Sequence, residues 1–413
     1  MSRSKYRWLF ILPSFAVGVA VTIYFWNYPP TSDGGIYLTH AEEIWRRPFS
    51  FANFTLRPSD FRYFSMGLLG LTYQLGVPSL DALKLLQVLL YFVALASLYD
   101  LCLELFPRIS SLEAGLSVLI FAVCPAYLAY LVGVALDFIA LSFHLLYLLL
   151  IMRRRWWAAS LSAIALAFSK ESGFFVYAAT LPVALWWSST GSGKSWGAQL
   201  LRPLPLFAPL LLHFLLLGVR QRSLMAVSAA APECGATGWA LVLSPNLCRR
   251  EIHCYLFNLF ALNFQWLLLI PIALGALRLS INRRLAREVL RYEVDVRKFT
   301  LVVLFLLAWV WAFTRCPLYN NVKYVLNAMP LWLLVSLVFA RAAFPAPWMR
   351  VPFLLMLLLS FGVSAVMSID PLSRQFYGLM RTDGRPMLCM ASRLTGPADC
   401  GNDEIIYNLQ RFL

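Results

Sequence analysis

Long apolar runs alternate with short polar breaks along most of the 413-residue chain. A helix that crosses a bilayer needs about 20 consecutive, mostly apolar residues, and the chain contains about eleven runs of that length or slightly less. The pattern therefore predicts an all-α, polytopic membrane protein. The expected spans are residues 8–26, 82–106, 112–130, 134–151, 156–170, 172–188, 203–219, 255–278, 299–315, 323–340 and 351–368.

The composition agrees with this class. The chain is 60% hydrophobic and 13% charged, with a mean hydropathy of +0.69, whereas a soluble domain carries about 25% charged residues. The formal net charge is +15. No basic stripe with interleaved aromatic residues lies outside the apolar runs, which argues against nucleic acid as a partner. We expect the positive charge to hold cytoplasmic loops against anionic membrane lipid instead.

Basic residues also predict the orientation of the spans. The stretch MSRSKYRW precedes an apolar run that is too long for a typical signal peptide and lacks a cleavage site, so we expect a retained first helix with a cytoplasmic N-terminus. The densest basic loop, 282–298, then falls on the cytoplasmic side, and three longer polar segments, 27–81, 220–254 and 369–413, fall on the outer side. We expect a transmembrane domain over 1–368, a short outer tail, and a bacterial inner membrane with the outer segments in the periplasm.

The first outer segment contains two stretches that predict helices lying in the membrane interface. Residues 36–47 are amphipathic, and residues 59–76 are aromatic but too polar at their start for a span. Two interfacial helices after a single span would shape a cavity at the bilayer surface. The alternative is a simple lipid-facing rim.

The cysteines lie mostly on the side that we expect to be oxidising. Of the eight cysteines, Cys102 and Cys124 fall within expected spans, and the others lie in or beside outer segments. This placement predicts about one to three disulfides, and no cysteine or histidine spacing supports a zinc site. The pairing does not follow from the sequence, and the simplest pairs are Cys234 with Cys248 and Cys389 with Cys400.

Ionisable residues beside membrane spans are candidates for function, because burying a charge there costs about 2.5–3.5 kcal/mol or more. The first is Asp33 in SDGGIY, a candidate general base or metal ligand, with Gly34 and Gly35 letting a substrate approach the backbone. In the alternative interpretation, Ser32 and Asp33 only cap the helix that follows.

Two further candidates open later spans. Asp137 stands at the start of the fourth span, where it either caps a helix or points into the same cavity as Asp33. His144, seven residues on, is more typical of a hydrogen-bonded interior residue than of a ligand. In SKESGFF, Lys170 and Glu171 occupy a turn so short that both must lie close to the membrane surface. A cation beside a carboxylate there suits a phosphate, and the alternative for the lysine is snorkelling to the interface.

The last candidate is the polar loop in TRCPLYNNVKYVLNAMPLW, residues 314–332. Arg315 and Lys323 flank this loop, and Tyr319 and Tyr324 beside them suit a phosphate and a sugar. The alternative is a pair of anchoring cations with interfacial tyrosines. Together the loops place three acids and three cations on one face, which describes a site for an anionic, partly lipidic substrate approached from the bilayer. The six residues are Asp33, Asp137, Glu171, Lys170, Arg315 and Lys323.

This arrangement resembles the GT-C superfamily of membrane glycosyltransferases, which includes protein O-mannosyltransferases, the aminoarabinose transferases of lipid A and the mycobacterial arabinosyltransferases. The resemblance begins with a basic start, one span, and an outer loop that opens with an acid in SDGGIY and carries two interfacial helices. An acid opening the fourth span in ALDFIAL, a Thr-Lys-Glu-Gly-like signature in SKESG with Ser169 for threonine, and a basic-Tyr-to-Pro run in KYVLNAMP also match. The order of these motifs is more specific than any one of them, and the match covers 1–190 and, more weakly, 300–340.

The resemblance implies a polyprenyl-phosphate sugar donor, transfer on the outer side, inversion at the anomeric carbon, and an acceptor hydroxyl on a lipid, a glycan or a secreted protein. It makes Asp33 the catalytic base. It makes Lys170, Arg315 and Lys323 ligands of the donor phosphate. The supporting acids or substrate-binding residues that it implies are Asp137, Glu171, Tyr37, His40 and Tyr324.

The resemblance leaves the need for a metal open. Many relatives carry two adjacent acids in the first loop, whereas Gly34 follows Asp33 here. A divalent cation, Mg²⁺ or Mn²⁺, would take its ligands from Asp33, Asp137 and Glu171.

Two other classes of membrane protein are alternatives to a transferase. A transporter or flippase also binds an amphipathic anion, but it requires charges at mid-bilayer depth, and the expected spans are nearly free of charge apart from Lys84, Glu104 and Glu113 near their ends. A non-catalytic membrane scaffold has no need for acids and cations gathered on one face. The sequence therefore favours the transferase, with transport as the alternative.

Overall fold

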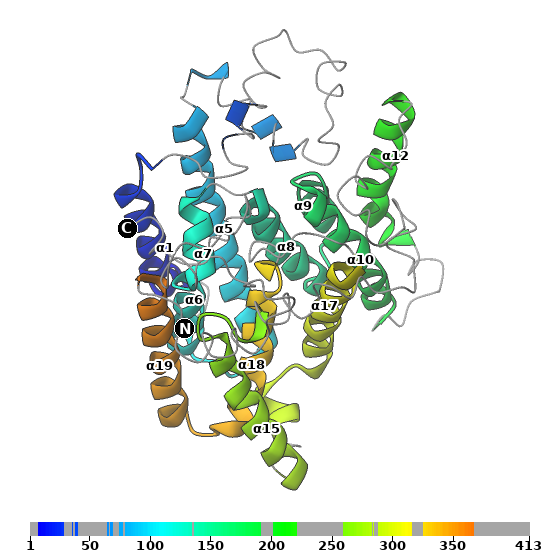
Figure 1. Cartoon of the computed structure of the whole chain (residues 1–413). Coiled ribbons are helices and arrows are strands. Elements are labelled where there is room, and N and C mark those ends of the chain that lie inside the picture. Colours follow the sequence, from blue (N-terminus) through cyan, green and yellow to red (C-terminus); the bar gives the residue numbers. More distant parts are fainter. Residues whose placement is uncertain are drawn as a thin grey trace, which may run out of the picture.

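A computed structural model shows a bundle of α-helices standing roughly side by side (Figure 1). The structure describes residues 7–28, 79–133, 136–190, 201–220, 259–282, 288–315 and 325–366, with short pieces at 35, 38–39, 64–65, 67–68, 74–76 and 284. Only the backbone is described for residues 7, 8, 79, 171, 216–220, 290 and 313–315. Within these ranges the regular structure is helical and no strand occurs, as the apolar runs predicted.

The helices coincide with the predicted apolar runs to within a few residues at most boundaries. The elements are α1 (Arg7–Tyr24), α5 (Ser79–Leu105), α6 (Ser111–Ala122), α7 (Pro125–Val132), α8 (Leu136–Met152), α9 (Trp156–Ala167), α10 (Glu171–Ser189), η1 (Leu204–Phe207), α12 (Ala208–Arg220), η4 (Gln265–Leu268), α15 (Leu269–Ile281), the π-helical turn η5 (Val289–Glu293), α17 (Val296–Arg315), α18 (Met329–Ala343) and α19 (Pro347–Val366).

Short connections make consecutive helices antiparallel and define two ends of the bundle. Residues 153–155 join α8 to α9, and residues 168–170 join α9 to α10. We call the end that carries Arg153, Arg154 and Arg155 the basic end. The opposite end, where α8 begins with Leu136 and Asp137, is called the Asp137 end below.

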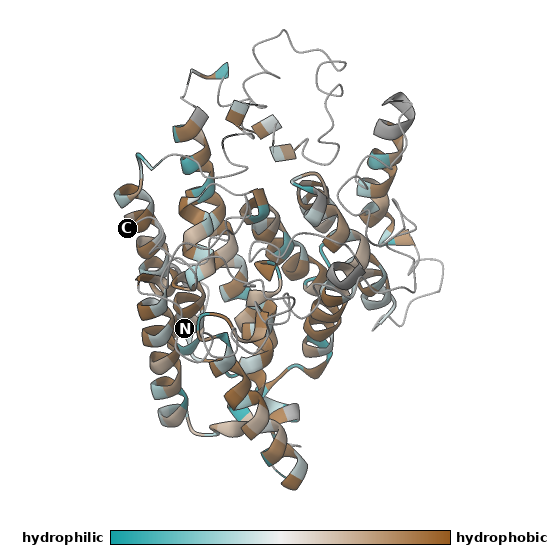
Figure 2. Cartoon of the chain, viewed as in Figure 1, coloured by the Kyte–Doolittle hydropathy of each residue, from teal (hydrophilic) through white to brown (hydrophobic). Residues whose placement is uncertain are grey.

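Apolar residues predominate along most of the helices (Figure 2). Large hydrophobic side chains stand exposed on several of them, among them Leu9, Leu85, Leu161 and Leu359. Soluble proteins rarely expose extended apolar surfaces of this kind. The surface therefore agrees with an integral membrane protein, in which lipid covers these side chains.

Few of the described helices cross a bilayer by length and composition alone. Leu80–Leu105 and Pro347–Val366 are long and apolar enough, and the bent pair α6–α7 is a third if it forms one span. The remaining apolar helices that the structure describes are shorter, and they are Leu9–Tyr24, Leu136–Met152, Trp156–Ala167, Leu204–Leu215, Gln265–Ile281 and Met329–Ala343. The number of about eleven spans stays a prediction.

Two predicted spans are interrupted, contrary to the continuous helices expected there. The run 112–130 is divided into α6 and α7, and the helix axis bends by 59° between them. The break occurs because Pro125 at the start of α7 lacks the N–H that would continue the hydrogen bonds of the helix. The run 255–278 is broken before α15 by Asn263 and Phe264, whose φ angles of 53° and 64° lie in the left-handed region. Both breaks are local backbone events that an average of hydropathy over the run does not detect.

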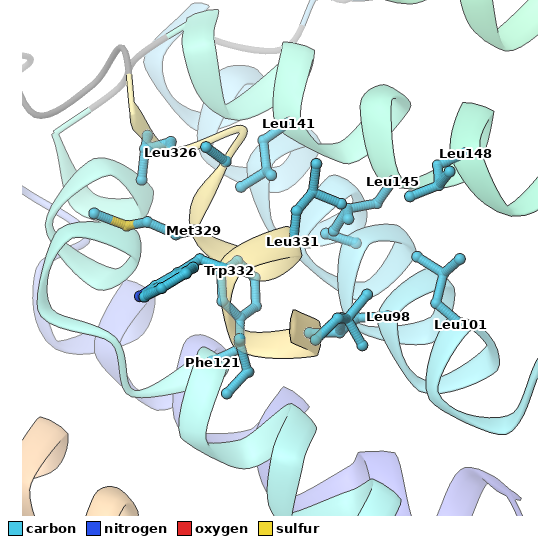
Figure 3. Close-up of a cluster of buried hydrophobic side chains, with 14 of the residues drawn as sticks. Leu98, Leu101, Phe121, Leu141, Leu145, Leu148, Leu326, Met329, Leu331 and Trp332 are labelled. Atoms are coloured by element: carbon cyan, nitrogen blue, oxygen red, sulfur yellow. The ribbon is translucent and has the colours of Figure 1, made fainter. Parts of the chain in front are cut away.

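The core forms where α18 packs against α5, α6 and α8. Its large side chains interlock there in a continuous apolar cluster (Figure 3). Beside this cluster the Tyr127 ring stacks between two other aromatic rings. Its centroid lies 5.1 Å from that of Tyr91 and 5.0 Å from that of Phe138. The residues labelled in Figure 3 are Leu98, Leu101, Phe121, Leu141, Leu145, Leu148, Leu326, Met329, Leu331 and Trp332.

Ion pairs join helix ends at the basic end of the bundle. Glu104 at the end of α5 accepts from Arg153 Nε at 2.9 Å and from Lys298 Nζ at 2.5 Å. A second, more buried group joins α6, α18 and α19 to the turn before α17. Charged side chains near the membrane are stabilised when they are paired in this way. Because the partners belong to different helices, both groups also hold these helices together. The second group consists of Glu113, Glu293, Arg341 and Arg350.

Candidate active site

The SKESG motif forms a tight turn between α9 and α10 at the Asp137 end. α9 ends at Ala167 and α10 begins at Glu171, so Lys170 precedes the helix in an extended conformation, with φ −165° and ψ 164°. Gly173 lies so close to the end of α9 that an added Cβ would come within 2.1 Å of the Leu166 carbonyl oxygen. The glycine therefore lets the first turn of α10 pack directly against α9, and this packing directs Lys170 toward α8.

Lys170 and Asp137 form a buried ion pair. Lys170 Nζ lies 2.6 Å from Asp137 Oδ2, and the two side chains are 5% and 1% exposed. Ser172 Oγ donates to the other carboxylate oxygen, Asp137 Oδ1, at 3.0 Å. A lysine this buried and paired is not snorkelling to the interface, which was the alternative interpretation of Lys170. Asp137 uses both carboxylate oxygens to contact the α10 side rather than serving only as a helix cap.

Part of the first outer segment is bonded to the same turn. The Phe64 amide donates to the Phe168 carbonyl at 2.9 Å, and Ser65 Oγ donates to the Ser169 carbonyl at 2.9 Å. The Phe64 ring also meets Phe143 edge to face, with centroids 5.2 Å apart. Residues 64 and 65 are helical and fall within the second predicted interfacial stretch. These two residues therefore lie directly beside the turn that carries Lys170, although about a hundred residues of chain separate them.

Lys84 closes the other side of the Asp137 end by capping α1. Its Nζ donates to the carbonyls of Phe25 at 2.8 Å and Tyr28 at 3.1 Å, and to that of Trp26. A cation at a helix C-terminus satisfies carbonyls that lack intrahelical partners and complements the helix dipole. This contact fixes the point where the chain leaves α1, a few residues before Asp33.

The last residue of α17 belongs to the same end of the bundle, whereas α18 begins deeper inside it. α17 begins at the basic end, where Lys298 pairs with Glu104, and its 20 residues span about 30 Å. Arg315, its last residue, therefore lies at the Asp137 end, although its side chain is not described. α18 ends with Arg341 in the ion-pair group at the basic end, and its start lies beside the break between α6 and α7, where Met329 Sδ is 3.9 Å from Cys124 Sγ.

Several predicted site residues lie outside the described part of the chain, so their contacts with this site remain predictions. Glu171 is the first residue of α10, but its side chain is not described. The predicted pairs of cysteines are equally untested. The residues outside the description are Asp33, Tyr37, His40, Lys323, Tyr324, Cys234, Cys248, Cys389 and Cys400.

Other predicted features have clearer positions. Cys102 and Cys124, which fall within expected spans, are buried free thiols. His144 is fully buried in α8, with its ring stacked on Phe305 of α17 at 6.0 Å between centroids, so it is an interior residue as expected. Among the residues with described side chains, no group of three or more His, Cys, Asp or Glu could hold a metal ion. The divalent cation stays an open expectation, because two of its three expected ligands, Asp33 and Glu171, are not in that set.

Three residues at the site were not singled out from the sequence. Ser172 lies two residues after Lys170 within SKESG, and the motif by itself gives this serine no separate role. Ser65 and Lys84 reach partners that lie 104 and 56 to 59 residues away, and a sequence pattern carries no signal for such contacts. The lysine near the start of a span was noticed as a charge, but its role as a cap depends on the position of α1.

No protein-family model matches the chain, and no curated protein matches it in sequence. The crystal structure of ArnT from Cupriavidus metallidurans bound to undecaprenyl phosphate is similar in fold, with a TM-score of 0.56 and 13% identity over 93% of this chain and 68% of ArnT. The apo structure of ArnT gives a TM-score of 0.51 and 13% identity over 90% of this chain and 66% of ArnT. The chain thus has a GT-C-like membrane fold, as the resemblance predicted.

Proposed function

We propose that the chain is a membrane glycosyltransferase that moves a sugar from a polyprenyl-phosphate donor to an acceptor hydroxyl, with inversion, on the outer side of the membrane. The observation that carries this proposal is the buried Asp137–Lys170–Ser172 cluster at one end of a GT-C-like bundle. The similar ArnT structure is bound to undecaprenyl phosphate. A lipid of that chemistry presents one phosphate to a site beside the bilayer.

Lys170 supplies positive charge where the donor phosphate would lie. In the transfer, the acceptor oxygen bonds to the anomeric carbon while the bond from that carbon to the phosphate oxygen breaks. Negative charge grows on the leaving phosphate, and a fixed cation nearby stabilises it. Asp137 and Ser172 fix the ammonium group through the contacts at 2.6 Å and 3.0 Å, so Asp137 acts as a positioning residue.

Asp33 and the remaining cations complete the proposed site. Asp33 takes the proton of the acceptor hydroxyl as the new bond forms. Because Asp137 compensates part of the charge of Lys170, we assign Arg315 and Lys323 as further ligands of the donor phosphate. The position of Arg315 at the end of α17 supports this assignment, since the helix directs it to the same end of the bundle.

The distribution of buried charge favours transfer over transport. Every buried Asp, Glu, Lys and Arg among the described residues lies within about two turns of a helix end. A transporter that carries an anion across the bilayer needs polar contacts at middle depth. The central parts of the described helices hold mainly apolar side chains, so the charges gather at two separate ends.

Binding of undecaprenyl phosphate to the purified full chain in nanodiscs tests the class of donor. The wild-type chain should bind this lipid more tightly than the uncharged polyprenol of the same length. Lys170→Ala should weaken binding by about 10- to 100-fold, because a hydrogen bond to a charged group contributes about 1.5–3 kcal/mol. Lys298→Ala, which removes a lysine paired with an acid at the basic end, is the matched control and should leave binding unchanged.

Transfer is measured with radiolabelled hexosyl and pentosyl polyprenyl phosphates in membrane vesicles. Asp33→Asn should abolish transfer and keep the binding of undecaprenyl phosphate, because it removes the base and leaves the cations in place. Equal binding of the lipid and the uncharged polyprenol would refute the proposed donor. Full transfer by Asp33→Asn would refute Asp33 as the base.

A further inference from the structure

A cavity lined by arginines and apolar side chains lies at the basic end, away from the proposed active site. It has a volume of about 810 Å³ and is formed by the α8–α9 connection, the start of α9 and the chain before α12. Asp137 lies at the other end of α8, whose 17 residues span about 25 Å. The cavity and the proposed donor site therefore face opposite sides of the membrane. Its charged and aromatic lining residues are Arg154, Arg155, Arg202, Trp156 and Trp157.

The walls of this cavity are held in place by hydrogen bonds. Ser160 Oγ of α9 donates to the Pro205 carbonyl at 2.5 Å, and the Tyr177 hydroxyl of α10 donates to the Leu206 carbonyl at 2.6 Å. Arg154 donates to the Thr190 carbonyl. The pocket is thus built between packed elements and is not a gap between loose loops.

Arg154 is held in an unfavourable backbone conformation. Its φ angle of 56° lies in the left-handed region, which costs a residue with a Cβ about 1–2 kcal/mol. Its guanidinium lies over the Trp187 ring, 5.4 Å from the centroid. Glycine would adopt this conformation without the strain. The contacts of the Arg154 side chain with Thr190 and Trp187 therefore hold a strained residue in a fixed place beside the cavity.

Positive charge in the cavity is not balanced by acids in the described part of the chain. Arg153 next door pairs with Asp100 at 3.0 Å, whereas none of the three lining arginines forms an ion pair with a described acid. Burial lowers the pKa of Arg154, and the nearby charges of Arg202 and Arg297 lower it further. An anion entering the cavity would relieve this repulsion.

The start of α9 adds backbone donors to the same cavity. The first N–H groups of a helix have no intrahelical partners and attract anions. No side chain caps α9, which begins at Trp156 with Arg155 at its N-cap position. The N-terminal residues of α9 up to Ala158 line the cavity, so both backbone donors and guanidinium groups surround it.

Apolar side chains form the rim of the cavity. Trp157 is 78% exposed, Leu201 65% and Leu204 52%. Tryptophan at a membrane surface commonly lies at the level of the lipid headgroups. A small soluble anion would not use these side chains, whereas a lipid would contact them with its glycerol and acyl groups.

We propose that this cavity binds the phosphate headgroup of an anionic phospholipid from the leaflet at the basic end. Arg155, Arg202 and the start of α9 contact the phosphate, and Trp157 with Leu204 contacts the acyl chains. Arg154 forms the fixed inner wall. The site is separate from the donor site, and its occupancy does not depend on which sugar the enzyme transfers.

Native mass spectrometry of the purified full chain, titrated with phosphatidylglycerol and with phosphatidylcholine, tests this proposal. The double variant Arg155→Gln/Arg202→Gln spares the anchored Arg154. It should weaken phosphatidylglycerol binding by about 30-fold, since each arginine near an anionic surface contributes about 1 kcal/mol and 1.4 kcal/mol is a tenfold change. The control Arg284→Gln/Arg291→Gln removes the same charge from the basic loop before α17 and should leave binding unchanged.

Three results would overturn the lipid site. The first is an equal loss of binding in the control variant, which would indicate attraction to net charge alone. The second is equal binding of phosphatidylcholine. The third is displacement of phosphatidylglycerol by glycerol phosphate at the same concentration, which would identify the site as one for a soluble phosphate. Transfer activity measured in parallel keeps this test separate from the proposed catalytic function.

Discussion

A double-mutant cycle on Asp137 and Lys170 separates their structural role from their proposed catalytic role. The two side chains are almost fully buried and their charged atoms lie 2.6 Å apart. Removing one partner of a buried ion pair costs about 3–5 kcal/mol, because the other charge is left without compensation. Lys170→Met and Asp137→Leu should each destabilise the bundle by this amount.

The double variant Asp137→Leu/Lys170→Met should be more stable than either single variant. Replacing both members of a buried pair by apolar side chains of similar size is often nearly neutral. Ser172 would lose the acceptor that it contacts at 3.0 Å, which costs about 1 kcal/mol. The free energy of unfolding of the double variant should therefore exceed that of each single variant by about 2 kcal/mol or more.

Unfolding is measured by denaturant titration of the purified chain in mixed micelles, and transfer is measured on the same preparations. We expect the double variant to recover stability but not transfer, because an apolar side chain at position 170 cannot stabilise the leaving phosphate. Additive destabilisation of the two single variants would show that the residues are not paired. Recovered transfer would show that the pair is purely structural and would refute the role of Lys170.

Three other substitutions test the supports of the site. Gly173→Ala should destabilise the bundle by about 1–3 kcal/mol, because the added Cβ would clash with the Leu166 carbonyl oxygen. Thermal unfolding measures this loss. The control is Gly362→Ala, where no atom lies within 4 Å of the added Cβ, and this variant should not lose stability. Lys84→Met should destabilise the protein by about 1.5–3 kcal/mol in the same assay, because the carbonyls of the turn that follows α1 lose the ammonium group that binds them. An unchanged melting temperature would contradict this role of Lys84. Ser65→Ala should lower the free energy of unfolding by about 1 kcal/mol, because Ser65 loses its hydrogen bond to the Ser169 carbonyl. The rate of transfer should fall by more than this small loss of stability explains. Unchanged kinetics would show that this hydrogen bond does not position the site.

The helices were largely predictable, because hydrophobic length is a local property. The apolar runs located α8, α9 and α10 and the brief polar turn at Lys170 between two of them. The break at Pro125 was not predicted, since the run stays apolar across it. Proline acts there through a missing hydrogen-bond donor, and an average of hydropathy does not register that loss.

The candidate site was only partly predictable. Counting spans places Asp137 and Lys170 at the same end, because α8 and α10 start there and each helix reverses the chain. Their ion pair also requires the tight turn that Gly173 permits and the packing of α10 against α8. Ser172 joined the cluster only through that packing.

The sequence alone determined the class of the protein, the approximate positions of its helices, and the placement of Asp137 and Lys170 at the same end of the bundle. Those features depend on a residue's neighbours along the chain and on the thickness of a bilayer. Only the tertiary structure decided that Lys170 is buried against Asp137, that Ser65 lies on the turn before it, and that Lys84 caps α1. These contacts join residues separated by 33 to 104 positions, and their geometry comes from helix packing, which no local pattern records.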